Sequence, residues 1–193
     1  MITLCCSLKV RKRLGLSDNL SPAKPATTVL GNWYVSLQHF GKLQLILATS
    51  EASLLSVVFP ARDLRLTLER NLQAGLGGVL LALGVNDELI TREQQEMEEV
   101  AYATTTNRSV IGSMNQLGMF LSYELERTAD MLSLALRLSH IPMTALKGKG
   151  ANTHPFPDIV TRELFGLNGR THLNSYPPVP TTWLTVRWLF TKK

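Results

Sequence analysis

The sequence predicts an α+β fold, in which a small, mostly antiparallel sheet of about five strands packs against several helices. Three observations lead to this prediction. Short runs in which apolar and polar residues alternate are typical of strands, and longer stretches repeat apolar residues at helical spacing. The chain has 193 residues, of which 45% are hydrophobic and 18% are charged. This composition excludes a wholly disordered chain and allows one buried core.

The first residues are expected to form a strand and a short helix. The apolar run Ile2–Cys6 indicates a short strand. Ser7 can cap a helix of one to two turns, and Gly15 can end it. The leucines of this helix, Leu8 and Leu14, are expected to face inward.

A loop and three strands are predicted next. Residues 17–28 contain two prolines and several small polar residues, which is typical of a loop. Apolar and polar residues then alternate over 33–38 and over 42–47, with a glycine between the two runs. A third run over 54–59 stops at Pro60. The pattern indicates three antiparallel strands.

The longest predicted helix follows these strands. From Asp63, a candidate N-cap, apolar residues recur at helical spacing up to Gly84, a candidate C-cap. Gly75, Gly77 and Gly78 lie inside this stretch. Each costs about 1 kcal/mol of helix propensity relative to alanine, so packing must supply roughly 3 kcal/mol. Without that packing the helix breaks at these glycines.

The remaining elements are mostly helical. Residues 86–99 predict a polar helix with six of the chain's 15 acids, which are expected to form a solvated face. Residues 100–105 alternate again and predict a short strand. Apolar residues at 3.6-residue spacing predict helices over 109–127 and 130–140. A further short helical segment is expected at 158–165.

The most distinctive segment joins the last predicted strand to the helix that follows. A helix N-terminus leaves backbone N–H groups free and carries a partial positive charge. Asn107 or Ser109 can cap this helix, or the same donors together with Arg108 can hold a phosphate or a carboxylate. Ser113 and Asn115 are polar among apolar neighbours on its first turns. Capping is the commoner role, and both interpretations stay open.

Residues 107–115 read Asn-Arg-Ser-Val-Ile-Gly-Ser-Met-Asn. This segment resembles the signature Asn-Arg-Ser-Val-x-Gly-Ser-Met-Asn of a bacterial family catalogued only as a domain of unknown function. The likeness covers roughly residues 1–166 and includes Leu-Gly-Asn-Trp-Tyr at 30–34. It implies membership of that family but no activity, cofactor or catalytic residue. The chain departs from the family in the glycines at 75, 77 and 78 and in its C-terminal segment.

These observations favour a cytosolic bacterial binding or regulatory module with an anion-binding junction at Asn107, Arg108 and Ser109. Two alternatives stay open. The first is a small enzyme acting on a phosphorylated or carboxylated small molecule, with Arg108 as anion clamp and Ser109 or Asn115 as a polar participant. The second is a protein-interaction partner in a two-gene system. An enzyme is less favoured because neither Ser109 nor Ser113 lies near a histidine or in a Gly-x-Ser-x-Gly elbow.

The net charge of +5 belongs to the two ends of the chain. Residues 1–13 carry +4, residues 167–193 carry +4, and the remainder carries −3. The basic residues of the first segment are candidate nucleic-acid contacts, although such a run is as often merely solvated. These residues are Lys9, Arg11, Lys12 and Arg13. We expect residues 1–166 to form one domain. Residues 167–193, with three prolines and two tryptophans, are expected to form a poorly ordered extension.

The sequence predicts no metal, no cofactor and no membrane span. Its two cysteines, Cys5 and Cys6, are adjacent, and its four histidines are scattered, so metal-ligand spacing is absent. No stretch approaches the roughly 20 apolar residues that cross a bilayer. The N-terminus is apolar first and basic afterwards, the reverse of a secretory signal. We therefore expect a cytoplasmic protein.

Overall fold

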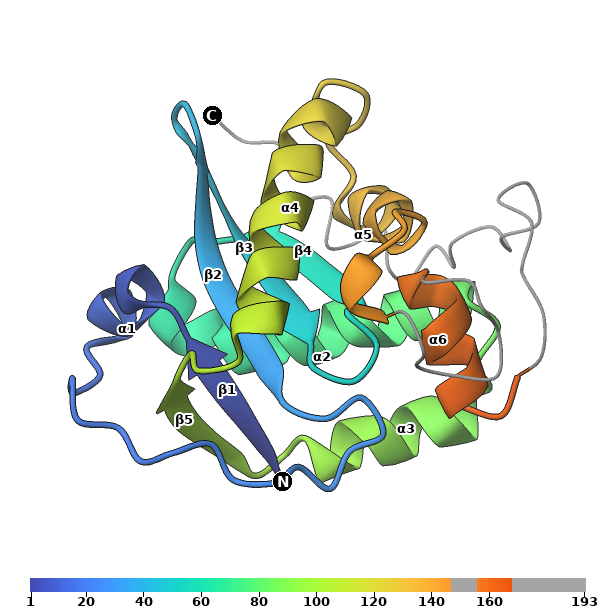
Figure 1. Cartoon of the computed structure of the whole chain (residues 1–193), viewed down its shortest axis with the longest axis horizontal. Helices are drawn as coiled ribbons and strands as arrows, with labels where there is room; N and C mark the ends of the chain where they lie inside the picture. The colour runs from blue at the N-terminus through green and yellow to red at the C-terminus, as the bar shows by residue number, and fades with distance from the viewer. Residues whose placement is uncertain (147–155, 168–193) are drawn as a thin grey trace.

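The computed structural model describes residues 1–146 and 156–167, and it confirms the α+β class (Figure 1). Five strands form one sheet: β1 (Ile2–Cys6), β2 (Trp33–Phe40), β3 (Leu43–Ser50), β4 (Ser56–Pro60) and β5 (Val100–Thr104). The α-helices are α1 (Leu8–Leu14), α2 (Leu64–Ala82), α3 (Asp87–Glu96), α4 (Arg108–Leu125), α5 (Met131–Ser139) and α6 (Pro157–Leu164). A short 3-10 turn, η1, spans Thr144–Leu146. Apart from Leu167, the predicted C-terminal extension lies outside the described residues.

The strand order is β4-β3-β2-β1-β5. The three antiparallel strands expected over residues 33–59 are confirmed, because β3 pairs antiparallel with both β2 and β4. β1 lies parallel to β2 on one side and to β5 on the other, so the sheet is mixed. Parallel neighbours need crossover connections, and α1 supplies the one between β1 and β2. β5 reaches the other side of β1 through α2 and α3, which connect it to β4 at the opposite edge of the sheet.

Helices cover both faces of the sheet (Figure 1). Val10 of α1 and Leu72 of α2 belong to the core cluster on one face, together with Trp33. Met114 of α4 and Leu134 of α5 belong to the cluster on the other face. Every residue of β1 is therefore buried, as expected for a central strand with both faces covered.

The helix α1 is confirmed, but its inward face differs from the prediction. Leu8 is 49% exposed, whereas Val10 is completely buried and Leu14 packs partly against the core. The prediction for Leu8 is wrong because a helix of two turns presents only one narrow stripe to the sheet, and Val10 occupies it. Gly15 ends the helix in the left-handed conformation, with φ of 72°.

The helix α2 runs without interruption through its three glycines, so the break considered at Gly75 does not occur. A Cβ atom on Gly75 would lie 2.4 Å from Cγ1 of Val57 on β4. The missing side chain therefore lets α2 approach the sheet closely, and this packing offsets the poor helix propensity of glycine. Asp63 precedes the helix with φ of 49° and makes no side-chain capping hydrogen bond.

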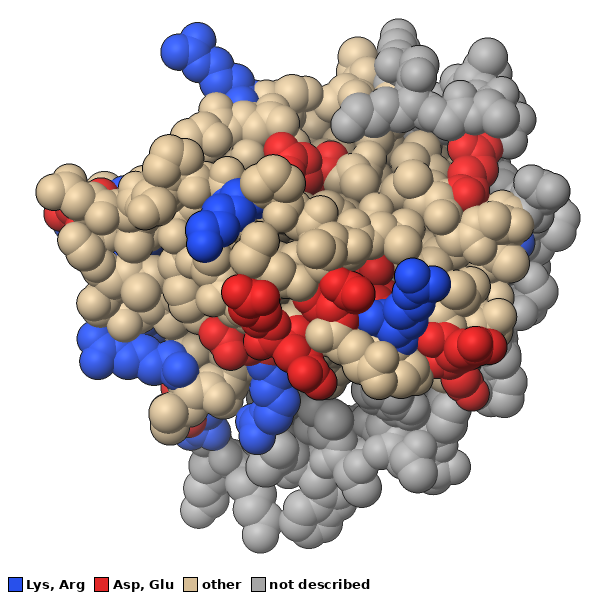
Figure 2. Space-filling model, turned by 90° about the horizontal axis from the view of Figure 1, so that it is seen from below, with Lys and Arg blue, Asp and Glu red and all other residues tan. Residues whose placement is uncertain are grey.

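The helix α3 is polar, and Asn86 caps it by accepting a hydrogen bond from the Leu89 N–H at 2.9 Å. Of the six acids at residues 86–99, four are exposed, two of them beyond the end of α3, and Figure 2 shows acidic side chains gathered on the face that is seen from below. Glu93 is an exception, because it is only 2% exposed. The prediction that all six acids form a solvated face is therefore wrong for Glu93.

Candidate functional site

The predicted anion-binding junction lies where two neighbouring parallel strands end. β1 ends at Cys6 and leads into α1, which packs on one face of the sheet. β5 ends at Thr104 and leads into α4, which packs on the opposite face. Adjacent parallel strands whose following helices diverge in this way define a topological switch point. In open sheets with parallel strands, ligands bind outside the carboxyl ends of the strands at such a point.

Asn107 connects α4 to two other parts of the sheet. Its side-chain oxygen accepts hydrogen bonds from the N–H groups of Ser109 at 3.1 Å and Val110 at 3.4 Å. Its side-chain nitrogen donates to Oε1 of Glu51 at 3.1 Å, and its backbone N–H donates to the hydroxyl of Tyr34 at 3.3 Å. Asn107 is thus the N-cap of α4 and fixes the start of that helix against β2 and the end of β3.

The other predicted site residues do not all lie together. Arg108 and Ser109 are exposed beside Asn107 at the start of α4. Ser113 is buried, and its hydroxyl donates to the carbonyl of Ser109 at 3.0 Å, so it is engaged within the helix. Asn115 is exposed, but it lies about 12 Å along the helix axis from Asn107, at 1.5 Å per residue. A single small ligand at the junction contacts Arg108 and Ser109 more readily than Asn115.

Three buried or half-buried groups under the junction escaped the sequence-based prediction. Cys5 and Tyr34 are register partners on β1 and β2, and Glu51 follows β3. Burial, with a smaller contribution from the Glu51 carboxylate, raises the pKa of the Cys5 thiol to about 11. Burial also raises the pKa of Tyr34. Cys5 is therefore a neutral thiol at physiological pH and is unsuited to nucleophilic attack.

The basic helix α1 presents three of its four cationic residues to solvent. Lys9, Lys12 and Arg13 are exposed. The side chain of Arg11 is only 13% exposed and forms an ion pair with Asp18, at 3.3 Å between Nη1 and Oδ1. Arg11 is therefore engaged by Asp18 and is the least exposed of the four cations. Nucleic-acid binding by this helix stays a prediction.

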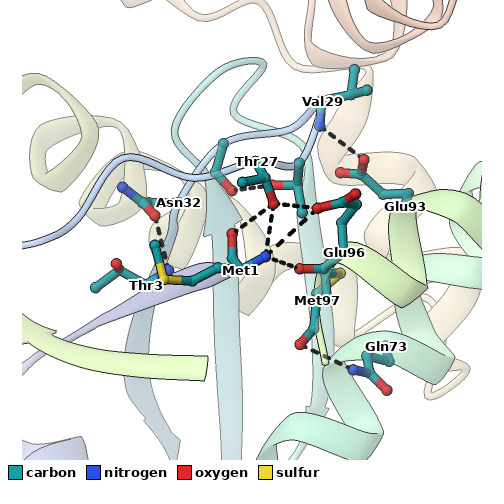
Figure 3. A network of polar contacts seen from close by, with 11 residues as sticks. Met1, Thr3, Thr27, Val29, Asn32, Gln73, Glu93, Glu96 and Met97 are labelled. Carbon is teal, nitrogen blue, oxygen red and sulfur yellow. Dashed lines mark hydrogen bonds and ion pairs between the residues drawn. The ribbon is translucent and has the colours of Figure 1, made fainter. Parts of the chain in front are cut away.

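A second polar region, at the amino ends of β1 and β5, was not predicted from the sequence (Figure 3). The carboxylate of Glu93 accepts hydrogen bonds from the N–H groups of Val29 at 2.8 Å and Leu30 at 3.0 Å. Nearby, the carboxylate of Glu96 accepts a hydrogen bond from Thr27 and lies 3.7 Å from the amino group of Met1. A pocket of about 200 Å³ adjoins these residues. The region joins α3 to the loop before β2.

Two further findings concern metals and membranes. Within residues 1–146 and 156–167, no group of three or more His, Cys, Asp or Glu side chains is arranged to hold a metal ion. In the same part of the chain, none of the helices combines the length and the apolarity that a bilayer crossing requires. Cys5 and Cys6 are both free thiols.

The protein is thus an α+β domain in which a helix capped by Asn107 begins at a topological switch point of the sheet. Residues 3–158 match the model of a family described as a domain of unknown function, DUF6933. The chain belongs to this family, as the resemblance of its middle motif implied. Comparisons with curated proteins and with solved structures give no match.

Replacing Asn107 with alanine is expected to destabilise the protein by about 1–2 kcal/mol, because α4 loses its cap. The contact with Glu51 is lost as well. Urea unfolding followed by circular dichroism measures the effect. Ser109→Ala is the matched control, since its exposed hydroxyl caps nothing in the described structure, and it is expected to change stability by less than about 0.5 kcal/mol. Equal effects of the two substitutions would contradict the capping role.

Proposed function

We propose that this protein is a binding module that takes a ligand with a phosphate or carboxylate group at the carboxyl ends of β1 and β5. The topological switch point carries this proposal, because α1 and α4 leave adjacent parallel strands toward opposite faces. α4 is a long helix, and the positive end of its dipole lies at this point.

Each residue of the junction has a distinct role in this proposal. The guanidinium of Arg108 supplies the charge that pairs with the ligand anion, and it presents several donors to the anion's oxygens. The hydroxyl of Ser109 supplies a further donor. Asn107 positions both by capping α4. The carboxylate of Glu51 opposes a second negative charge close to it, so the anion is expected on the Arg108 side of the junction.

Binding without catalysis fits the chemistry of the junction better than an enzyme does. The hydroxyl of Ser113 is engaged with the Ser109 carbonyl, and burial keeps the thiol of Cys5 protonated. Among the described residues, neither group forms a hydrogen bond with a histidine or a carboxylate that could act as its base. A bacterial origin and a cytoplasmic location stay predictions, and the proposal does not depend on them.

The test compares ligand-induced thermal stabilisation of the wild-type protein and the Arg108→Ala variant. The probes are inorganic phosphate, a nucleoside monophosphate, a sugar phosphate and a tricarboxylate. At least one probe is expected to raise the Tm of the wild-type protein, and Arg108→Ala is expected to weaken binding about tenfold or more. Arg127→Ala, in an exposed residue just beyond the other end of α4, is the matched control and should bind as the wild type does.

Two results would overturn the proposal. One is the absence of stabilisation by any of these probes. The other is equal stabilisation of the wild-type protein and Arg108→Ala, because the anion would then bind elsewhere.

A further inference from the structure

The strand β2 has an open edge beyond the end of β1. β1 pairs with β2 only at Trp33, Tyr34 and Val35, whereas β2 continues to Phe40. On its other side, β2 pairs with β3 along its whole length. Figure 1 shows the β2–β3 hairpin extending past the ends of β1 and β5. Residues 36–40 therefore have a sheet neighbour on one side only.

The backbone groups that face this open edge can be assigned from the pairing. The carbonyl of Val35 accepts a hydrogen bond from the N–H of Ser7 at 2.9 Å, so the backbone groups of Val35 face β1. Because these directions alternate along a strand, the N–H and C=O groups of Leu37 and His39 face the same side. Within the described part of the chain, no backbone group pairs with them there. Four hydrogen-bonding groups are thus available in a row.

Basic side chains lie on two elements that adjoin this edge, the helix α1 and the β2–β3 turn. α1 follows β1 directly and contacts β2, and it presents Lys9 and Lys12 to solvent. Arg13 donates a hydrogen bond to the side chain of Gln44, the β3 residue that pairs with His39. Lys42 is exposed in the hairpin turn. The open edge thus lies between cationic groups of α1 and of the turn.

We propose that the open edge of β2 binds an extended acidic peptide segment, which adds a strand beside residues 36–40. Leu37 and His39 supply the backbone hydrogen bonds, and the cations of α1 and the turn attract the acidic side chains. Leu37 packs against the same core cluster as Val10 of α1, so α1 lies on one face of the added strand. The peptide therefore carries its acidic residues at every second position, on that face. This inference uses residues distinct from the anion-binding junction and does not rest on that proposal.

The experiment uses the full chain and a fluorescein-labelled octapeptide of alternating Glu and Val. Fluorescence polarisation is expected to show binding that weakens as salt is raised from about 50 to about 300 mM. The same peptide with alternate backbone nitrogens methylated keeps its charge but loses strand hydrogen bonding. It is expected to bind at least about tenfold more weakly. Hydrogen exchange at the amides of Leu37 and His39 is expected to slow when the unmodified peptide binds.

Two variants of the protein complete the test. His39→Pro removes one N–H from the open edge and is expected to weaken peptide binding about tenfold or more. His39→Ala keeps that N–H and is expected to bind within about twofold of the wild type. If His39→Pro fails to fold, the proposal is still tested by comparing how tightly the unmodified and the methylated peptide bind to the wild-type protein.

Several outcomes would overturn the proposal. Equal binding of the unmodified and methylated peptides would show that the peptide binds through its charge and not through backbone hydrogen bonds to β2. Binding of a single-stranded oligonucleotide with no binding of the peptide would assign the basic surface to nucleic acid. A dimer that dissociates on His39→Pro, with no peptide binding, would assign the edge to a second copy of the chain.

Discussion

Replacing Glu93 with alanine is expected to lower the free energy of unfolding by about 3 kcal/mol at neutral pH. The Glu93 carboxylate accepts the N–H groups of Val29 and Leu30, and it is only 2% exposed (Figure 3). Alanine leaves both donors without an acceptor, and a buried unsatisfied polar group costs about 1–3 kcal/mol. The loop before β2 also loses its attachment to α3. Urea unfolding followed by tryptophan fluorescence measures the loss as a lower midpoint.

Glu96→Ala is the matched control, because Glu96 lies one turn further along the same helix. Its carboxylate accepts a hydrogen bond from Thr27 and lies near the amino group of Met1, but it is far less buried than that of Glu93. The substitution is therefore expected to have a much smaller effect than Glu93→Ala. If the two variants lose equal stability, the buried hydrogen bonds of Glu93 are not the cause.

The Glu93 carboxylate also makes the free energy of unfolding depend on pH, and the direction of its shifted pKa fixes the sign of that dependence. Burial raises the pKa of Glu93 above its ordinary value of 4.5, against the opposing effect of the two N–H donors. Between the ordinary and the raised pKa, the folded protein holds a proton that the unfolded chain has released. The contribution of Glu93 to stability therefore falls as pH rises through this interval. The difference in unfolding free energy between the wild type and Glu93→Gln is expected to fall in the same way, and a rise would contradict the assignment.

Glu93 also marks the limit of what the sequence could predict about polar residues. Its neighbours in the sequence suggest a solvated acidic helix, and four of the six acids at residues 86–99 are indeed exposed. The residues that bury and pair Glu93 are Val29 and Leu30, more than 60 positions earlier in the chain. Such a contact follows from the packing of α3 beside the loop before β2. No local pattern encodes it.

The junction shows the same division between local and distant contacts. The position of Asn107 between a strand and a helix predicts a cap, and the cap is confirmed because its partners, Ser109 and Val110, are two and three residues away. The contacts of Asn107 with Tyr34 and Glu51 were not predicted, since they span 73 and 56 positions. Similarly, local apolar runs and alternation located all five strands. They did not reveal that β1 lies parallel to its two neighbours, because pairing is a property of the whole chain.

Replacing Gly75 with alanine is expected to destabilise the protein by about 1–3 kcal/mol, although alanine is the better helix former. A Cβ atom at this position would lie 2.4 Å from Cγ1 of Val57, a distance at which something must move. Val57 is buried on β4 and its β-branched side chain has little rotamer freedom, so the helix or the strand must shift. Urea or thermal unfolding measures the effect, and the midpoint is expected to fall.

Gly78→Ala in the same helix is the matched control. The nearest atom that its Cβ would meet is Cδ1 of Leu132 at 3.8 Å, an ordinary contact. Here the gain in helix propensity acts without a clash, so this variant is expected to be more stable by up to about 1 kcal/mol. Combining Gly75→Ala with Val57→Ala removes the clashing methyl groups, and the loss at Gly75 should become smaller in that background. Opposite signs at two glycines of one helix would show that close packing against β4, and not propensity, maintains glycine at position 75. A gain in stability at both positions would contradict that explanation.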